Sequence, residues 1–519
     1  MSEKSTITKS ATGVGALTMV SRITGFVRDA VVSHIFGAGA VTDAFNIAFT
    51  IPNLFRRLLA EGALSIALVP VFSEYAATRD RQALKRLYDS TLSVMAAALL
   101  FVTVLGVAFS PIVVKMFAPG FVSDQFELAV VLNRVMFPFL TLVGLTSFFI
   151  ATLYARRSFM VPAMAPILLN VSQIVFAVVL FAVVKPPILG LAIGVLCGGV
   201  LQLALESVTV GYGGYRPSFR WEPRHPDVKR MMFLLLPAIL GIAVYQVNVM
   251  VSRALASFLP KASITYIYLS DRLLELPLGV FAVAVATVSL PTLAALASKK
   301  EWDSYRRTLS FAVRLTFFIC IPAMAGLIAL VKPVVSLLFQ HGAFTSANTM
   351  DCAAVATMGL LGIWSVAGTR NVAQGFYALN DTKTPVKAAI VAFVVNAVFS
   401  LTLMGPLGAP GLTLSNSISS AVNFIYLAWA LHKKVGGWGV GEVVSSALKS
   451  LVAATVMAAA VYPVSRMDVW LEHGRYALKS GVLFGAVAGG LSIYMLVAYM
   501  LGQPELKAAI EKVRGRFGR

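Results

Sequence analysis

The sequence predicts an all-α protein that crosses a membrane many times, and three observations predict it. Of the 519 residues, 58% are hydrophobic and only 13% are charged, against about 25% charged in an ordinary soluble domain. Apolar stretches recur from Ala11 to Leu501, with no gap long enough for a soluble domain. These stretches are long and do not alternate between apolar and polar residues, which excludes the strands of a membrane barrel.

The individual helices follow from the length of each apolar stretch. A helix needs about 20 apolar residues to cross the hydrocarbon core of a bilayer. Divided at glycine, proline and charged residues, the stretches predict about 14 transmembrane helices. Their centres lie near residues 22, 55, 99, 140, 172, 200, 243, 279, 318, 364, 394, 421, 453 and 490. The first is predicted to be an uncleaved membrane helix, because charged residues interrupt its apolar core.

The basic residues of the loops alternate as this number of helices requires. Lys and Arg number 26 in one set of alternate loops together with both termini, and seven in the other set. Because cytoplasmic loops collect basic residues, we expect both termini in the cytoplasm. The net charge of +20 is therefore explained by membrane topology, and we expect no nucleic-acid partner.

Landmark residues recur at a nearly constant spacing along the chain. Pro111 and Pro333 are 222 residues apart, and Gly190 and Gly411 are 221 apart. This order predicts two pseudo-symmetric six-helix lobes, residues 1–220 and 221–440, followed by two further helices and a basic tail in 441–519. Parallel lobes of this kind are typical of alternating-access transporters. A symmetric scaffold without transport is the alternative.

Charged residues inside the predicted helices give the strongest functional signal, since inserting each one costs about 2.5 to 3.5 kcal/mol. In the first helix, Arg22, Arg28 and Asp29 share one face. Under the repeat spacing, Arg28 aligns near Met250 and Arg56 near Leu278, so these charges have no match in the second lobe. This asymmetry favours recognition of an asymmetric ligand over structural ion pairs.

Two further helices carry similar groups. The second opens with Asp43 and contains Arg57 and Glu61, which are four residues apart and can pair, so Arg56 is the freer cation. The eighth places Asp271, Arg272 and Glu275 on one helical turn.

Arginine donates two parallel hydrogen bonds and stays charged at any physiological pH, which suits phosphate. We therefore expect an anionic head group to be bound by Arg22, Arg28, Arg56 and Arg272. The residues expected to form gating ion pairs are Asp43, Arg57, Glu61, Asp271 and Glu275. The alternative for all of them is a purely conformational role.

Other kinds of site have little support. The three cysteines are isolated in apolar stretches, so we expect no metal site and no disulfide. No nucleophile–base set or phosphate-binding loop occurs, and we do not expect an enzyme. We expect no cofactor, with Asp29 as a possible coupling site for Na⁺ or H⁺, or the membrane potential as the driving force.

The chain resembles the MurJ (MviN) lipid II flippase family of the multidrug/oligosaccharidyl-lipid/polysaccharide exporter superfamily over nearly its whole length. The stretches that carry the resemblance are SRITGFVRDAVVSHIFGAGAVTDAF, IPNLFRRLLAEGALSIALVPVFSEY, YLSDRLLELPLGVFAVAVATVSLP and GFYALNDTKTPVKAAI. The family's functional positions match Arg22, Arg28, Asp43, Arg56 and Arg272 by motif.

The resemblance implies translocation of lipid II, the undecaprenyl-pyrophosphate-linked peptidoglycan precursor, from the inner to the outer leaflet of a bacterial cytoplasmic membrane. It implies a role in cell-wall biogenesis and cell shape, with lipid II, membrane lipids and other cell-wall synthesis proteins as partners. It also implies that the last two helices form a groove for the lipid tail. The alternatives are a cation-coupled exporter of small molecules or of other polyprenyl oligosaccharides, and a membrane scaffold for cell-wall synthesis.

Overall fold

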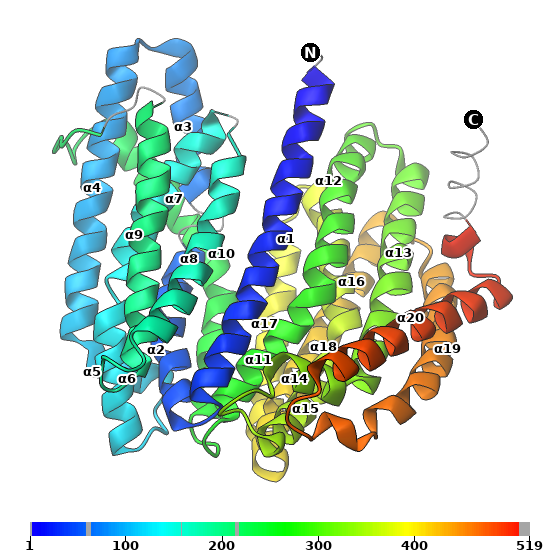
Figure 1. Cartoon of the computed structure of the whole chain (residues 1–519). Helices are drawn as coiled ribbons and strands as arrows, with labels where there is room; N and C mark the ends of the chain where they lie inside the picture. Colours follow the sequence, from blue (N-terminus) through cyan, green and yellow to red (C-terminus); the bar gives the residue numbers. More distant parts are fainter. Residues whose placement is uncertain (1–2, 59–63, 157, 213–216, 508–519) are drawn as a thin grey trace. The chain divides into compact units, whose positions relative to one another are not determined.

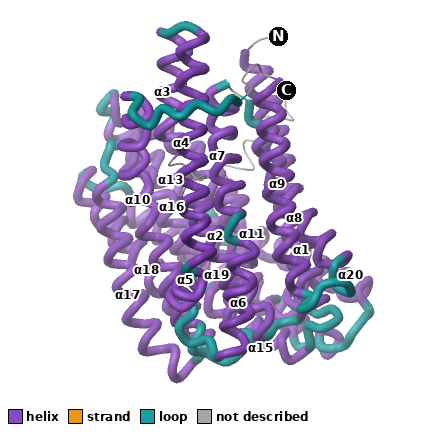
Figure 2. Tube along the Cα trace, turned by 90° about the vertical axis from the view of Figure 1, so that its left-hand side faces the viewer, coloured by secondary structure: helices purple, strands orange, loops and turns teal. Residues whose placement is uncertain are grey.

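The computed structural model describes residues 3–58, 64–156, 158–212 and 217–507, and within these ranges every regular element is a helix (Figures 1 and 2). The predicted all-α fold is confirmed. Packing divides the chain into two compact units, Met1–Ala262 and Ser263–Arg519.

The first unit is built from helices α1 to α10. They are α1 (Glu3–Phe36), α2 (Ala40–Leu58), α3 (Leu64–Thr78), α4 (Arg81–Ala108), α5 (Ser110–Phe117), α6 (Ser123–Met136), α7 (Phe139–Ala155), α8 (Met160–Val179), α9 (Ile188–Tyr212) and α10 (Pro226–Ala256).

The second unit is built from α11 to α20 and two short irregular helices. They are α11 (Ser263–Pro277), the π-helix η2 (Leu278–Ala282), α12 (Val283–Ser298), α13 (Trp302–Ala329), α14 (Val331–Phe339), α15 (Ser346–Leu360), α16 (Ile363–Ala378), α17 (Lys383–Leu407), α18 (Ala409–Val435), α19 (Val440–Ser465), the 3₁₀-helix η3 (Asp468–Trp470) and α20 (Tyr476–Met500).

Ten segments of the described residues are long and apolar enough to cross a membrane, and they coincide with ten of the predicted transmembrane helices. The four other predictions, centred near residues 22, 55, 243 and 421, fall on α1, α2, α10 and α18. Charged or polar residues within α1, α2 and α18 lower their mean hydropathy. The chain is a multi-pass membrane protein.

The internal repeat appears in the order and length of the helices. The 28-residue α4 is followed by the short α5, and the 28-residue α13 by the short α14. The two breaks precede Pro111 and Pro333, which the sequence spacing pairs. A proline has no N–H and clashes with the preceding turn, so each long helix ends at the same place in its repeat.

Packing groups α10 differently from the predicted lobe boundary. The predicted lobes 1–220 and 221–440 assign α10 to the second lobe, by its correspondence to α1. In the structure, α10 contacts α2, α3, α4 and α5, and the packing boundary follows residue 262. The boundaries at 220 and 440 stay predictions about the repeat.

The last two transmembrane helices are added to the second unit. α19 packs along α13, and α20 lies beside α19 (Figure 1). Tyr494 of α20 is buried, and its Oη donates a hydrogen bond to the carbonyl oxygen of Phe318 on α13 at 2.7 Å. These two helices follow the second set of six helices in the predicted repeat and are not part of it.

Paired glycines bring neighbouring helices into close contact in both units. A Cβ on Gly190 of α9 would lie 2.9 Å from the carbonyl oxygen of Phe176 on α8. A Cβ on Gly411 of α18 would lie 2.3 Å from the carbonyl oxygen of Leu403 on α17. Small residues allow this approach, which packing between transmembrane helices depends on.

Gly411→Ala should therefore destabilise the second unit by about 1 to 3 kcal/mol, because the backbone of α17 must move away. The measurement is thermal unfolding of the purified protein in detergent. Gly405→Ala on α17 is the matched control, since a Cβ there meets no atom within 4 Å. Equal unfolding temperatures for the two variants would contradict this account of the helix contact.

Candidate functional site

Arg28 on α1 is buried and held by two other polar side chains. It is 5% exposed, and its Nε and Nη2 donate to Oδ1 of Asp29 at 3.0 and 2.6 Å. Its Nη1 donates to Oδ1 of Asn170 on α8 at 3.2 Å. A buried guanidinium is stable only when such partners compensate its desolvation. Arg28 thus ties the polar face of α1 to α8.

Gly25 lies on the same face of α1, in ordinary van der Waals range of Asn170. A Cβ at Gly25 would lie 3.5 Å from Nδ2 of Asn170. The Nδ2 of Asn170 also donates to the carbonyl oxygen of Ser21 at 3.2 Å. Arg22, on the next turn of α1, is half-buried. The polar face predicted from the sequence is therefore turned toward α8 at Gly25 and Arg28.

Asp43 at the start of α2 is also buried, at 2% exposure. Its Oδ2 accepts a hydrogen bond from the backbone N–H of Ala262 at 2.7 Å. Ala262 has a φ of 77°, a left-handed conformation that costs free energy in a residue other than glycine. The carboxylate stabilises this strained residue at the end of the first unit.

The two arginines at the end of α2 have different surroundings. Arg56 is half-buried, and its Nε donates to Oδ1 of Asn53 one turn earlier at 2.8 Å. Arg57 is half-buried as well. Its predicted partner Glu61 lies outside the described residues, so the Arg57–Glu61 pair stays a prediction.

In the second unit, Arg272 on α11 contacts an acid and a tyrosine. Its Nη1 lies 3.1 Å from Oε2 of Glu275. Its Nε and Nη2 donate to the hydroxyl of Tyr268 at 3.2 and 2.9 Å, and the guanidinium lies 5.1 Å from the centre of that ring. The Arg272 side chain is 29% exposed, so part of it remains accessible. Asp271 is half-buried on the same turn.

Two residues of these clusters were not found from the sequence. Tyr268 precedes Arg272 by one helical turn, and this spacing was a usable signal. Asn170 is 142 residues from Arg28, and its only signal was an amide side chain within a largely apolar helix. Among the described residues, no three His, Cys, Asp or Glu side chains gather as a metal site.

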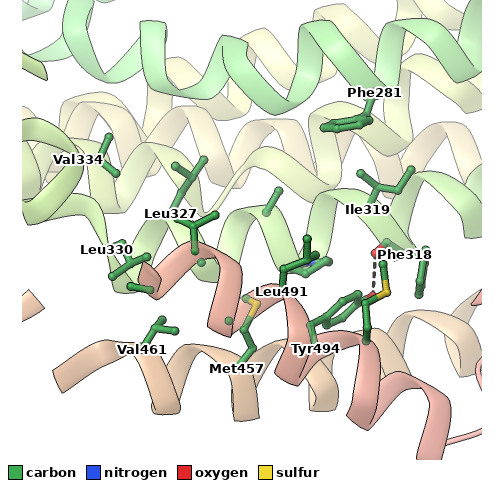
Figure 3. Close-up of a pocket in the computed structure, with 17 residues that line it drawn as sticks. Phe281, Phe318, Ile319, Leu327, Leu330, Val334, Met457, Val461, Leu491 and Tyr494 are labelled. Carbon is green, nitrogen blue, oxygen red and sulfur yellow. Dashed lines mark hydrogen bonds between the residues drawn. The ribbon is translucent and has the colours of Figure 1, made fainter. Parts of the chain in front are cut away.

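An apolar cavity of about 500 Å³ lies in the second unit, between α13, α14, α19 and α20 (Figure 3). Figure 3 shows Leu327 of α13 and Leu330, which follows α13, facing Leu491 and Tyr494 of α20 across it. Its 17 lining residues carry no charge, and the two C-terminal helices form one side. Such a cavity suits a hydrocarbon chain.

Comparison with known proteins places these features in a family context. A family model described as "Lipid II flippase MurJ" matches residues 32–480. The chain is 34% identical over 515 residues to the probable lipid II flippase MurJ of Vibrio cholerae, with 97% of this chain and 98% of the relative covered. It is 36% identical over 428 residues to the lipid II flippase MurJ of Burkholderia cenocepacia, with 81% and 83% covered.

Solved structures show the same fold. One described as lipid II flippase MurJ in an inward closed conformation superposes with a TM-score of 0.80 at 24% identity, and covers 94% of this chain and 98% of its own. An inward-facing multidrug resistance MATE family transporter gives a TM-score of 0.69 at 14% identity, covering 82% and 98%. Similarity at these identities bears on the fold alone.

The contact between Asp43 and Ala262 generates a stability prediction. Asp43→Ala leaves a buried N–H without an acceptor, which costs about 1 to 3 kcal/mol. We expect a lower unfolding temperature in a thermal melt of the purified protein. Asp124→Ala, at an exposed acid in the first turn of α6, is the control and should change it much less. A melt of Asp43→Ala that matches the wild type would exclude this anchoring role.

Proposed function

This chain belongs to the lipid II flippase MurJ family, and we propose that it carries lipid II from the inner to the outer leaflet of a bacterial cytoplasmic membrane. The observation that carries the proposal is the similarity to a probable lipid II flippase along 97% of the chain. The family consists of lipid transporters, so the residues described above are assigned to binding and movement rather than to covalent chemistry.

The proposed orientation places both termini in the cytoplasm. It is supported by the 26 basic residues on one side of the predicted topology against seven on the other. With this orientation, the start of α2 and the junction at Ala262 lie toward the outer side. The ends of α2 and α9 lie toward the inner side, where lipid II is made.

We assign the pyrophosphate and sugar head group to Arg22, Arg28, Arg56 and Arg272. Arg28 and Arg272 each hold their present partners through several donors. Phosphate oxygens would replace these acceptors, because a guanidinium binds phosphate through the same parallel donors. Binding would then break contacts that stabilise this conformation, and a ligand drives a change only through such differences between states.

The polyprenyl tail is assigned to the apolar cavity between α13, α14, α19 and α20. Its lining is wholly uncharged, and each buried CH₂ contributes about 0.8 kcal/mol. The tail would stay in contact with this surface or with lipid while the head group passes through the protein. This assignment gives α19 and α20, which lie outside the predicted repeat, a role in holding the tail.

Arg28→Ala and Arg272→Ala should abolish flipping, because each removes a cation from the proposed head-group site. Arg28→Lys should also lose most of the activity, since an ammonium group cannot reproduce the fork that reaches both Asp29 and Asn170. The measurement is the rate at which labelled lipid II crosses proteoliposome membranes. Arg475→Ala, at a side chain that is 65% exposed, is the control. Wild-type rates in both alanine variants would overturn the head-group assignment.

Gly326→Phe should place a ring in the apolar cavity, which Gly326 lines, and so slow the flipping of lipid II. The larger side chain can be accommodated, because only the flexible end of Met457 lies near a Cβ at this position, at 3.4 Å. Gly485→Phe, also in the second unit but with no atom within 4 Å of its Cβ and outside the cavity lining, is the matched control. The same assay with a lipid II analogue that has a short tail should show little loss. Equal loss for long and short tails would contradict the tail assignment.

A further inference from the structure

Glu206 on α9 is a buried acid that has no part in the proposed binding of the head group or tail. Its exposed fraction is 0%. Neither of its carboxyl oxygens has a hydrogen-bond partner among the described residues, and no ion pair reaches it. Within the described part of the chain, it is the only acid with both oxygens buried and unbonded.

Among the described residues, no basic side chain of the helices around Glu206 pairs with it. α9 packs against α8, α7, α6 and α2. The sequences of α7 and α8 contain no Asp, Glu, Lys, Arg or His. Tyr154, near the end of α7, is the titratable side chain that interacts electrostatically with Glu206. The charged residues on or next to the packed helices, none of which pairs with Glu206, are Asp43, Arg56, Arg57, Asp124, Glu127, Arg134 and Arg156.

These surroundings determine the charge of the carboxyl group. An ionised carboxylate buried in a low-dielectric region without a hydrogen bond or counterion is so costly that the group takes up a proton instead. A protonated carboxyl group is neutral and costs far less to bury. The packed arrangement of α7, α8 and α9 is therefore compatible with a neutral Glu206.

The internal repeat supports the same conclusion. The spacing of 221 that pairs Gly190 with Gly411 pairs Glu206 with Leu427. Leu427 is 1% exposed and belongs to the hydrophobic core of the second unit. An apolar side chain thus fills the equivalent place in the other repeat, so the scaffold needs an uncharged group there and does not need an acid.

We propose that Glu206 is a proton-binding site whose occupancy is linked to the conformation of the first unit. Its carboxylate binds one proton from water when α7, α8 and α9 are packed around it, and releases that proton when they move apart. Only the O–H bond forms or breaks. Glu206 is six residues from the end of α9, or about 9 Å along the helix, so the path to water at that end is short.

The proposal rests on the proposed function and gives transport a coupling ion. Because the proton binds the packed form, low pH favours that form and rising pH favours its opening. A site of this kind would couple flipping to the proton concentration on the side where α9 ends.

The first test detects the bound proton directly and needs no substrate. Infrared difference spectroscopy of the purified protein at neutral pH should show the C=O stretching band of a protonated carboxyl group without a hydrogen bond, and Glu206→Gln should lose that band. Glu505→Gln is the matched control, because Glu505 is equally buried, at 3%, but lies 3.2 Å from Nε of Arg314. Absence of the band in the wild type, or its persistence in Glu206→Gln, would overturn the proposal.

The second test measures the linked conformational change through a natural cysteine. Cys197 on α9 is half-buried, whereas Cys320 and Cys352 are buried in the second unit. The rate of maleimide labelling at Cys197, resolved by mass spectrometry, is measured across a pH series in the wild type, Glu206→Gln and Glu206→Leu. Division of the wild-type rate by each variant's rate cancels the ionisation of the thiol itself. The ratio should increase with pH, and a constant ratio would exclude the linkage.

Flipping assays then connect the site to transport. Wild-type flipping of lipid II should change with pH, and this dependence should be lost in Glu206→Gln and Glu206→Leu. An unchanged dependence in both variants would overturn the coupling role. Failure of the wild type to flip lipid II would instead overturn the proposed function, while the infrared and labelling results would still decide whether Glu206 binds a linked proton.

Discussion

The cost of placing a polar group inside a membrane-spanning fold governs the arrangement of this protein's interior. A charge in the hydrocarbon region must find its partners within the protein, because neither lipid nor distant water can supply them. Arg28 meets this requirement through Asp29 and Asn170, and Arg272 through Glu275 and Tyr268. These partners hold in place the two arginines that we propose to bind the head group.

The two units share a scaffold but differ in what they carry. Paired prolines end α4 and α13, and paired glycines bring α8 to α9 and α17 to α18. The charged residues do not follow the repeat, and the apolar cavity involves α19 and α20, which only the second unit contains. A duplicated frame therefore carries two different sets of side chains, to which the two proposed tasks, contact with a charged group and contact with a hydrocarbon chain, are assigned.

The sequence was sufficient to predict the helical fold, the repeat and the positions of most helices, because apolar length, proline and glycine are local signals. It also singled out Arg28 and Arg272 as charges within apolar stretches, and their role in binding stays a prediction. It could not reveal that α10 packs with the first unit. Nor could it identify Asn170, because its partner Arg28 lies on a helix distant in sequence. Glu206 could not be identified either, because what sets it apart is the lack of charged residues on the helices α7 and α8 that pack against it.

The hydrogen bond from Ala262 to Asp43 bears on where α11 begins. Ala262 is the last residue of the first unit, and α11 of the second unit begins at the next residue, Ser263. The buried carboxylate of Asp43 thus holds the backbone at the residue directly before α11. This one hydrogen bond therefore sets the point from which the backbone enters α11, the helix that carries Arg272.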